Sequence, residues 1–407
     1  MLAQFYAPIV GGEERMTEAL SLALGARGHE VAVATLRQPG QDAYEERDGI
    51  RVHRLPGVAQ RFGRLFSESG RRHAPPVPDP ETVRALRRVL ERERPQVVHA
   101  HNWLAHAFLP LRRRSPAAFV MSLHDFSLVC ANKRLVRAGS ACGGPGPGKC
   151  VACAARQYGA VVGPPVALLT AAGGHALRRA VDIFLPVSRA VALGCALGTR
   201  GERFEVVPNF LVDRPRIADP DDPRLAALPA DPFILFVGDV TRDKGVDVLL
   251  DAHARMTATV PLVLIGRLAD PQLVDARANV LALGPMAHDG VLGAWRRCAV
   301  GVVPSVQPEA FGVVALEAAS AGKAVVASAH GGLPDVVADG ETGLLVAPRD
   351  AAGLAAALDR LIADPALRSS MGAAAAVRAV GFGADAVVPR IEAAYGRAMS
   401  ARTERGR

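Results

Sequence analysis

Two glutamates eight positions apart have the chemistry and spacing to bind a phosphorylated sugar. Glu309 and Glu317 flank the Phe-Gly pair in the sequence QPEAFGVVALE. The apolar run before them, 299–303, is typical of a buried parallel strand, and the residues from Val313 to Ala321 favour a short helix. The N-terminus of a helix presents free backbone N–H groups that bind phosphate readily. We therefore expect one carboxylate to bind ribose hydroxyls, the other to bind sugar hydroxyls, and the N–H groups to bind phosphate.

A lysine occupies a comparable position earlier in the same half of the chain. Lys244 lies between a predicted strand, 233–237, and a predicted helix that begins at Val246. A cation at the carboxyl end of a strand and the start of a helix could neutralise phosphate, and Arg242 could assist it. A surface lysine in a turn is the alternative.

Further candidates lie in the first half of the chain. Gly11 and Gly12 precede a predicted helix and would allow a ligand to approach the backbone closely, although a plain tight turn is the alternative. His124 and Asp125 directly follow a predicted strand, and His101 ends another. A histidine at such a strand end could contact a reacting sugar, and a histidine that is merely hydrogen-bonded is the alternative.

Four of the six cysteines form a cluster that ends in Cys-x-x-Cys. They are Cys130, Cys142, Cys150 and Cys153. In a protein without a signal peptide, such a cluster suggests a metal before a disulfide, so a structural zinc site is our interpretation. A redox pair or unligated thiols are the alternatives.

Composition excludes several classes of protein. The chain has 407 residues, half of them hydrophobic, which is enough for two domains with full cores. The apolar region 160–172 is interrupted by Gly163-Pro164-Pro165, so we expect no transmembrane helix, and no signal peptide is evident. We therefore expect a cytoplasmic protein.

The net charge of +8 comes from arginine, much of it in the first third of the chain. This excess predicts attraction to an anionic membrane surface, with an ordinary solvated face as the alternative. Only 5% of the residues are aromatic, which disfavours nucleic acid as a partner.

Both halves alternate short apolar runs with helical patterns, as expected for an α/β protein with two doubly wound parallel sheets. The predicted strands are 30–35, 50–55, 96–100, 117–123, 182–187, 204–207, 233–237, 262–265, 280–283, 299–303, 324–327 and 343–346. The predicted helices are 14–27, 81–92, 189–198, 246–256, 290–297, 313–321, 351–363, 366–380 and 384–399. A boundary is expected within 208–232, a mobile loop within 56–80 and a frayed tail from Arg402, and Pro389 should kink or break the last helix.

The motifs, in this order, resemble those of the retaining nucleotide-sugar glycosyltransferases of family four, also called group 1 glycosyl transferases. The resemblance rests on these segments: 4–13 and 24–31, the strand VVHAHN at 97–102, the turn VVPN at 206–209, the two glutamates at 309–317, and 331–335 followed by 340–348. It spans nearly the whole chain. The Cys-rich insert after His124 and Asp125 resembles a subset of the family that is often linked to surface polysaccharide assembly.

The resemblance implies the GT-B fold, with two Rossmann-like domains facing a cleft. Residues 1–207 would form the acceptor domain and 208–383 the donor domain, with helix 384–399 crossing back to the first. The donor would be a nucleotide diphosphate sugar, and the acceptor a saccharide or lipid-linked saccharide at the inner membrane face. No cofactor or metal would be needed for catalysis.

Residue roles also follow from the resemblance, by matching positions. Lys244 would hold the diphosphate, Glu317 the ribose, and Glu309 the donor sugar. Backbone groups of Phe311, Gly312 and Val313 would meet sugar and phosphate, Leu283 to Met286 would edge the base, Gly12 would approach the diphosphate, and His124 the anomeric carbon. Gly11, His101 and Asp125 would lie on the acceptor side.

Two departures from the family pattern bear on function. The family usually has arginine at the position of Asp239, beside the diphosphate, so either Arg242 substitutes for it or the loop turns Asp239 away. The family also begins with an apolar strand of which only residues 1–3 remain here. A nucleotide-sugar epimerase of the same fold and a non-catalytic sugar-nucleotide binding protein are the alternative functions.

Overall fold

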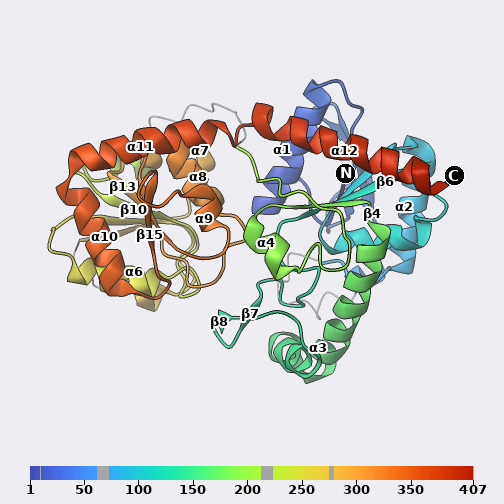
Figure 1. Cartoon of the computed structure of the whole chain (residues 1–407), viewed down its shortest axis with the longest axis horizontal. Helices are drawn as coiled ribbons and strands as arrows, with labels where there is room; N and C mark the ends of the chain where they lie inside the picture. Colours follow the sequence, from blue (N-terminus) through green and yellow to red (C-terminus); the bar gives the residue numbers. More distant parts are fainter. Residues whose placement is uncertain (10, 62–72, 212–222, 275–278, 407) are drawn as a thin grey trace. The chain divides into compact units, whose positions relative to one another are not determined.

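The chain divides into two compact units. The computed structural model describes residues 1–9, 11–61, 73–211, 223–274 and 279–406 (Figure 1). Unit 1 comprises 1–137, 142–209 and 387–407, and unit 2 comprises 138–141 and 210–386. The chain therefore passes from unit 1 to unit 2 after Asn209 and returns after Ala386, within three residues of the expected boundaries at 207 and 383.

The described strands of unit 1 include a seven-stranded sheet in the order β3-β4-β2-β1-β5-β6-β9. The strands are β1 (Leu2–Ala3), β2 (Ala32–Leu36), β3 (Tyr44–Arg47), β4 (Ile50–Leu55), β5 (Val97–His101), β6 (Ala118–Leu123) and β9 (Ile183–Pro186). All neighbours pair in parallel except β3 and β4. The central first strand is thus present as the two-residue β1, in which Leu2 pairs with Ala34 and Ala100.

The helices of unit 1 are α1 (Gly12–Ala26), α2 (Pro80–Glu93), α3 (Pro147–Ala180), α4 (Arg189–Gly194) and α12 (Ala384–Gly406), with 3-10 turns η1 (Ala59–Arg61) and η3 (Trp103–Leu111). A short pair, β7 (Val136–Arg137) and β8 (Ser140–Ala141), precedes α3. The predicted strand 204–207 is present only as a parallel bridge between Phe204 and Phe184, although Glu205 N and Val207 N also donate to the carbonyls of Phe184 and Pro186 in β9, each at 3.0 Å. Residues 62–72, which make up much of the mobile loop expected within 56–80, lie outside the described residues.

The last helix is longer and more regular than the sequence predicts. α12 continues through Pro389 and on to Gly406, so the predictions of a break at Pro389 and of a frayed tail from Arg402 are wrong. Ala401 is buried, and Arg402 Nη2 donates to the carbonyls of Arg112 and Ser115 at 3.2 and 2.9 Å. These contacts hold the end of the helix against unit 1.

Helix α3 runs across the interruption that the sequence predicts. The helix carries Pro164 and Pro165 in its interior, and its one non-helical residue is Gly159, with φ +84°. The two prolines are the fifth and sixth residues after this kink, so each removes an N–H donor from the ladder of the second segment. By length and composition alone α3 could cross a membrane, but a third of its most apolar window is buried inside unit 1.

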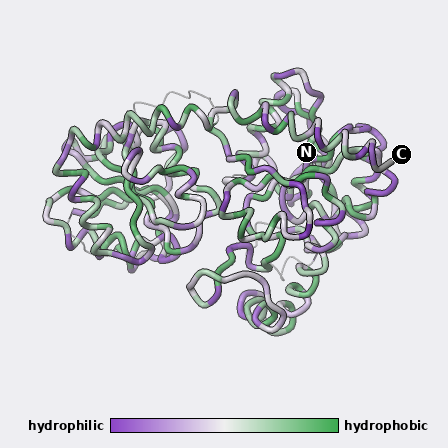
Figure 2. The backbone as a smooth tube through the Cα atoms, viewed as in Figure 1, coloured by the Kyte–Doolittle hydropathy of each residue, from purple (hydrophilic) through white to green (hydrophobic). Residues whose placement is uncertain are grey.

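Unit 2 is a six-stranded, fully parallel sheet in the order β12-β11-β10-β13-β14-β15 among the described strands. The strands are β10 (Ile234–Val237), β11 (Leu262–Ile265), β12 (Val280–Gly284), β13 (Val300–Val303), β14 (Val325–Ser328) and β15 (Gly343–Val346). The helices are α5 (Pro223–Ala226), α6 (Val246–Arg255), α7 (His288–Arg297), α8 (Val313–Ser320), α9 (Leu333–Val336), α10 (Ala351–Ala363) and α11 (Pro365–Val380), with the 3-10 turn η4 (Pro271–Leu273). Helices cover both faces, which is why the strands read as continuous apolar runs (Figures 1 and 2).

Candidate functional site

Each sheet reverses its strand order at one point, and the candidate residues gather there. In unit 2 the chain builds outward from β10 through β11 to β12, and then from β13 in the other direction, so β10 and β13 are neighbours. Ligands of open α/β sheets bind at the carboxyl ends of the strands at such a reversal. The loop after β10 carries Lys244, and the loop after β13 carries Glu309.

Lys244 and Glu309 form an ion pair at this point, with 2.7 Å between Lys244 Nζ and Glu309 Oε1. Ser305 Oγ donates to the same carboxylate oxygen at 2.6 Å. Burial alone would raise the pKa of Glu309, but the Lys244 charge and the hydrogen bonds from Lys244 and Ser305 hold it below its ordinary value. The Glu309 carboxylate is therefore a fixed anion, 22% exposed, with the 41% exposed Lys244 ammonium beside it.

Two glycines fix the backbone of Glu309. Gly331 has φ +62°, and a Cβ added there would lie 2.4 Å from the Glu309 carbonyl oxygen. The next N–H, of Gly332, donates to that oxygen at 2.7 Å. The preceding His330 uses Nε2 to reach the Ser305 carbonyl at 2.8 Å. A side chain at position 331 would displace Glu309, so the glycine is required by close approach as well as by φ.

The N-terminus of α8 lies next along the chain from Glu309. Gly312 is its N-cap with φ +109° and offers no side-chain cap, so the first N–H groups, beginning with Val313, have no capping side chain. Phe311 is buried, with its ring 6.0 Å from that of Phe382. The arrangement combines a carboxylate, an ammonium and helix N–H donors, which suits a ligand with hydroxyl and phosphate groups.

Glu317 lies one turn inside α8 and is buried, with 10% of its side chain exposed. His288, at the start of α7, places Nδ1 3.7 Å from Glu317 Oε1. Leu283 lies in β12, and Met286 follows it in the segment leading to α7. These two side chains are half-buried.

The two other charged positions after β10 have different partners from those expected. Arg242 is largely exposed and faces Asp247 and Asp270 at 3.5 and 3.8 Å. Asp239 pairs with Arg267, which follows β11, at 2.8 Å. The carboxylate of Asp239, which departs from the family pattern, is thus paired with the guanidinium of Arg267, just after the neighbouring strand β11. The sequence analysis missed this pair.

In unit 1 the sheet reverses between β1 and β5, and a second group gathers there. Gly11 is the N-cap of α1, and a Cβ there would lie 2.1 Å from Glu14 Oε2, whereas a Cβ on Gly12 would meet open space. Glu13 accepts a short hydrogen bond from Asn102 Nδ2. Burial, followed by the charge of Asp125, raises the pKa of Glu13 to about 8.

Three histidines lie side by side at the same edge of the sheet. His99 bonds Tyr395 Oη at 2.7 Å and Ser122 Oγ at 2.8 Å, and its ring lies 4.4 Å from that of His101. His101 Nδ1 and His124 Nε2 share a hydrogen bond of 2.9 Å. Burial lowers the pKa of His124 to about 4, against the opposing charge of Asp125, and the pKa of His101 also falls well below its usual value.

His124 is therefore a neutral imidazole at neutral pH. No well-aligned hydrogen bond to its Nδ1 or to the Nε2 of His101, both buried, occurs within the described residues, although a contact with the Asn209 side chain raises the pKa of His124. The Asp125 carboxylate, in contrast, accepts from Ser127 N at 2.8 Å and serves a local turn. Of the three acceptor-side candidates, His101 contacts His124 directly, and Gly11 and Asp125 have structural contacts of their own.

The four clustered cysteines are not gathered around a common point among the described residues. All are free and half-buried, and the described residues contain no group of three or more His, Cys, Asp or Glu side chains placed to hold a metal ion. Cys130 Sγ donates to Asn132 Oδ1 at 2.8 Å, Cys142 Sγ to the Gly144 carbonyl at 3.4 Å, and Cys150 Sγ accepts from Gly146 N at 3.2 Å. Cys153 Sγ accepts from Asn132 Nδ2 at 3.5 Å, so Cys130 and Cys153 share Asn132 as a partner. The zinc site stays a prediction.

The structure brings Lys244 to Glu309 beside the start of α8, and it adds several residues that the sequence analysis missed. Ser305 directly follows a strand end, and Glu13 follows a glycine pair, so both had a weak positional signal. His330, His288 and Arg267 carried none, because their roles depend on which strands and loops are neighbours.

Comparison with known proteins agrees with this geometry. Residues 219–378 match the family of glycosyl transferases group 1, and residues 11–209 match the glycosyl transferase 4-like domain. The D-inositol 3-phosphate glycosyltransferase of Arthrobacter sp. is 30% identical over 412 residues, which cover 92% of this chain and 87% of that protein. The corresponding enzyme 1 of Catenulispora acidiphila is 33% identical over 74% of this chain and 71% of its own. The match to that of Frankia alni, 38% identical, spans 46% of that protein and 41% of this chain.

Solved structures share the fold over nearly the full chain. Sucrose-phosphate synthase from Thermosynechococcus elongatus superposes with a TM-score of 0.73 at 22% identity, over 98% of this chain and 100% of its own. HepE of Anabaena, solved with UDP-glucose, superposes with a TM-score of 0.68 at 17% identity, over 97% of this chain and 98% of its own. With both halves matched and relatives aligned over most of their length, the chain belongs to the group 1 glycosyl transferases and has their GT-B fold of two Rossmann-like domains.

Proposed function

We propose that this chain transfers a sugar from a nucleotide diphosphate sugar to a saccharide or lipid-linked acceptor, with retention of the anomeric configuration. The observation that carries the proposal is the Lys244–Glu309 pair, which lies beside the uncapped N-terminus of α8. Lys244 neutralises the diphosphate, and Val313 and the following N–H groups donate to sugar and phosphate oxygens. Glu309 accepts from donor sugar hydroxyls, and Glu317 accepts from ribose hydroxyls.

The chemical step in this proposal depends on stabilising the leaving diphosphate. As the bond between the anomeric carbon and the diphosphate oxygen breaks, negative charge grows on that oxygen. The Lys244 ammonium, held by Glu309, and the N–H donors of α8 would stabilise this charge electrostatically. The acceptor hydroxyl attacks from the face that the diphosphate leaves, which retains configuration, and its proton passes to the departing diphosphate.

The acceptor side of the proposal rests on unit 1. A neutral His124 can share a hydrogen bond with a sugar hydroxyl, because its Nε2 already bonds His101 and its Nδ1 has no well-aligned partner among the described residues. The positive charge of the chain supports an acceptor held at the cytoplasmic face of an anionic membrane, in surface polysaccharide or glycoconjugate synthesis.

Donor binding and turnover test the proposal separately. Calorimetry with UDP, GDP, ADP and their sugars should give saturable binding of one nucleotide series, lost in Lys244→Ala and in Glu317→Ala. Incubation of that nucleotide sugar with candidate acceptors should then release the nucleoside diphosphate. Binding without turnover would favour a non-catalytic protein, a free epimer formed without acceptor would favour an epimerase, and no binding would refute the donor site.

A further inference from the structure

Helix α3 consists of two segments with different surroundings. The kink at Gly159 separates 147–158 from 160–180, and a Cβ on Gly163 would lie 2.4 Å from the backbone of Ala154. The two segments therefore pack closely where they meet. The second segment then runs along unit 1 toward β9 (Figure 1).

The face of the second segment that packs on unit 1 is made of small residues. The buried positions are Gly163, Ala167, Thr170, Gly173, Gly174 and Leu177. A Cβ on Gly173 would lie 2.5 Å from His106 Nε2, and one on Gly174 would lie 2.2 Å from the Leu128 carbonyl oxygen. Small residues are thus required for this close contact, and the helix lies against the protein along its length.

The opposite face carries the large apolar side chains, and we call it the outer face of α3. It consists of Val161, Pro165, Leu168, Leu169 and Ala172, spaced i, i+4, i+7, i+8 and i+11. Val161 is 86% exposed, Leu168 63% and Leu169 40%. A surface helix of a globular protein normally places its large apolar residues toward the core, so this distribution is inverted. A contiguous exposed apolar stripe marks an interaction surface.

The charge of α3 indicates what the outer face contacts. The 34 residues of the helix contain no Asp or Glu, whereas Lys149, Arg156, Arg178 and Arg179 are cationic. A surface that is apolar along its middle, cationic at its ends and free of acidic groups suits an anionic lipid interface, because phosphates meet the cations while acyl chains meet the stripe.

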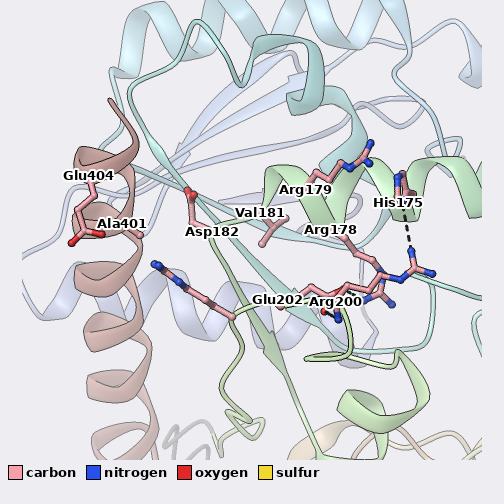
Figure 3. A pocket seen from close by; sticks show the side chains of 11 residues that line it. His175, Arg178, Arg179, Val181, Asp182, Arg200, Glu202, Ala401 and Glu404 are labelled. Atoms are coloured by element: carbon pink, nitrogen blue, oxygen red, sulfur yellow. Dashed lines mark hydrogen bonds and ion pairs between the residues drawn. The ribbon is translucent and has the colours of Figure 1, made fainter. Parts of the chain in front are cut away.

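A cavity of about 550 Å³ lies at the C-terminal end of α3, lined by four arginines and three carboxylates, which are Arg178, Arg179, Arg200, Arg203, Asp182, Glu202 and Glu404. His175, Arg178 and Arg179 line it from the helix, and Figure 3 shows Arg178 pointing toward Glu202. Arg200 Nη1 lies 3.4 Å from His175 Nδ1. Arg178 is neutralised by Glu202. Arg179 and Arg203 line the same cavity and have no ion-pair partner within the part of the chain that the structure describes.

We propose that the outer face of α3 lies in the interfacial layer of an anionic bilayer, with Arg179 and Arg203 contacting lipid phosphates. The helix lies along the membrane and does not cross it, since its inner face is packed on unit 1. This inference deepens the membrane association proposed above. Its test uses neither donor nor acceptor, so it can fail while glycosyl transfer stands.

Sedimentation with vesicles tests the proposal. The full chain is mixed with vesicles of equal phosphatidylglycerol and phosphatidylcholine, or of phosphatidylcholine alone. We expect binding to the anionic vesicles that weakens with salt, and a loss of at least about tenfold in partitioning for Leu168→Asp/Leu169→Asp. Arg179→Ala/Arg203→Ala should lower binding to anionic vesicles by about 30-fold, at about 1 kcal/mol for each arginine, while leaving any binding to phosphatidylcholine unchanged.

A matched control places the same chemistry elsewhere. Val377 and Val380 on α11 are 75% and 74% exposed, so Val377→Asp/Val380→Asp adds two charges at exposed apolar positions outside α3. This variant should bind vesicles like the unchanged chain. The circular dichroism spectrum and the melting temperature should be similar for all variants, which shows that each is folded.

Three results would overturn the proposal. The first is an unchanged chain that does not bind anionic vesicles, and the second is equal binding by Leu168→Asp/Leu169→Asp. The third is a dimer in sedimentation equilibrium that dissociates in this variant and does not bind vesicles, which would assign the outer face of α3 to a second copy of the chain.

Discussion

Replacing Glu309 with glutamine should separate stability from activity. Glu309→Gln keeps the shape of the side chain and removes the charge that Lys244 Nζ contacts at 2.7 Å. Because the two side chains are 22% and 41% exposed, water screens the pair, and its loss should cost only about 1 kcal/mol. That corresponds to a fall of about 2–4 °C in the melting temperature of a domain of this size.

The loss of activity should be far larger. Without the carboxylate, Lys244 is no longer held beside the uncapped start of α8, and the donor sugar loses a charged acceptor. Loss of one preorganised electrostatic contact at a reacting centre typically costs about 3–4 kcal/mol, or 10²–10³ in kcat/KM. The assay is the release of nucleoside diphosphate from the donor identified by calorimetry.

The control is Asp251→Asn on α6, which removes the same charge from an exposed pair with Arg255 at 3.1 Å. Its melting temperature and kcat/KM should stay close to those of the unchanged chain. If Glu309→Gln keeps kcat/KM within about threefold, the proposed role of the pair at the site is wrong. Because the pKa of Glu309 is lowered in the folded chain, its contribution to stability is present above pH 4.5 and is lost as the pH falls below that value.

Four further predictions follow from other contacts. Gly331→Ala should lower the free energy of unfolding by about 2–3 kcal/mol and weaken donor binding, measured by urea unfolding and calorimetry, because its Cβ would meet the Glu309 carbonyl. Glu13, whose pKa is raised to about 8, binds a proton in the folded chain that the unfolded chain releases above pH 4.5. The stability of the wild-type chain therefore falls as the pH rises through 8, and thermal unfolding should show that Glu13→Gln prevents this fall. His124, with a pKa of about 4, stays neutral in the folded chain while the unfolded chain takes up a proton below pH 6.5, so stability should fall from pH 6.5 to 4 by about 2–3 kcal/mol, and less in His124→Gln. Elemental analysis of the purified protein should find about one zinc per chain if the four cysteines rearrange into a site, and its absence would refute the zinc prediction.

Much of the fold could be predicted because its strands are buried on both faces. Leu262–Ile265 and Gly343–Val346 are uninterrupted apolar runs bounded by loops, and their predicted bounds match the structure. The helix Ala351–Ala363 also matches, with Asp350 as an N-cap that accepts from Gly353 N.

The errors occurred where local preference and tertiary contact disagree. A strand of two residues, β1, gives no periodicity, yet backbone pairing on both sides holds it. Pro389 predicts a break, but contacts of α12 with unit 1, such as Arg390 with Glu205 at 3.0 Å, hold the helix on either side of it. For the same reason the sequence shows that α3 is apolar without showing which of its faces points inward.

The candidate site depended on a further kind of information, namely which strands are neighbours. Each strand end could be located from sequence, and each carried its own reactive residue, but the pairing of Lys244 with Glu309 joins residues 65 positions apart. It exists because β13 returns to the side of β10 instead of extending the sheet beyond β12. The same reversal in unit 1 brings Glu13 to Asn102, 89 positions away. A strand order that placed β13 at the edge would keep every motif and lose the ion pair, so the site is a property of the topology as much as of its residues.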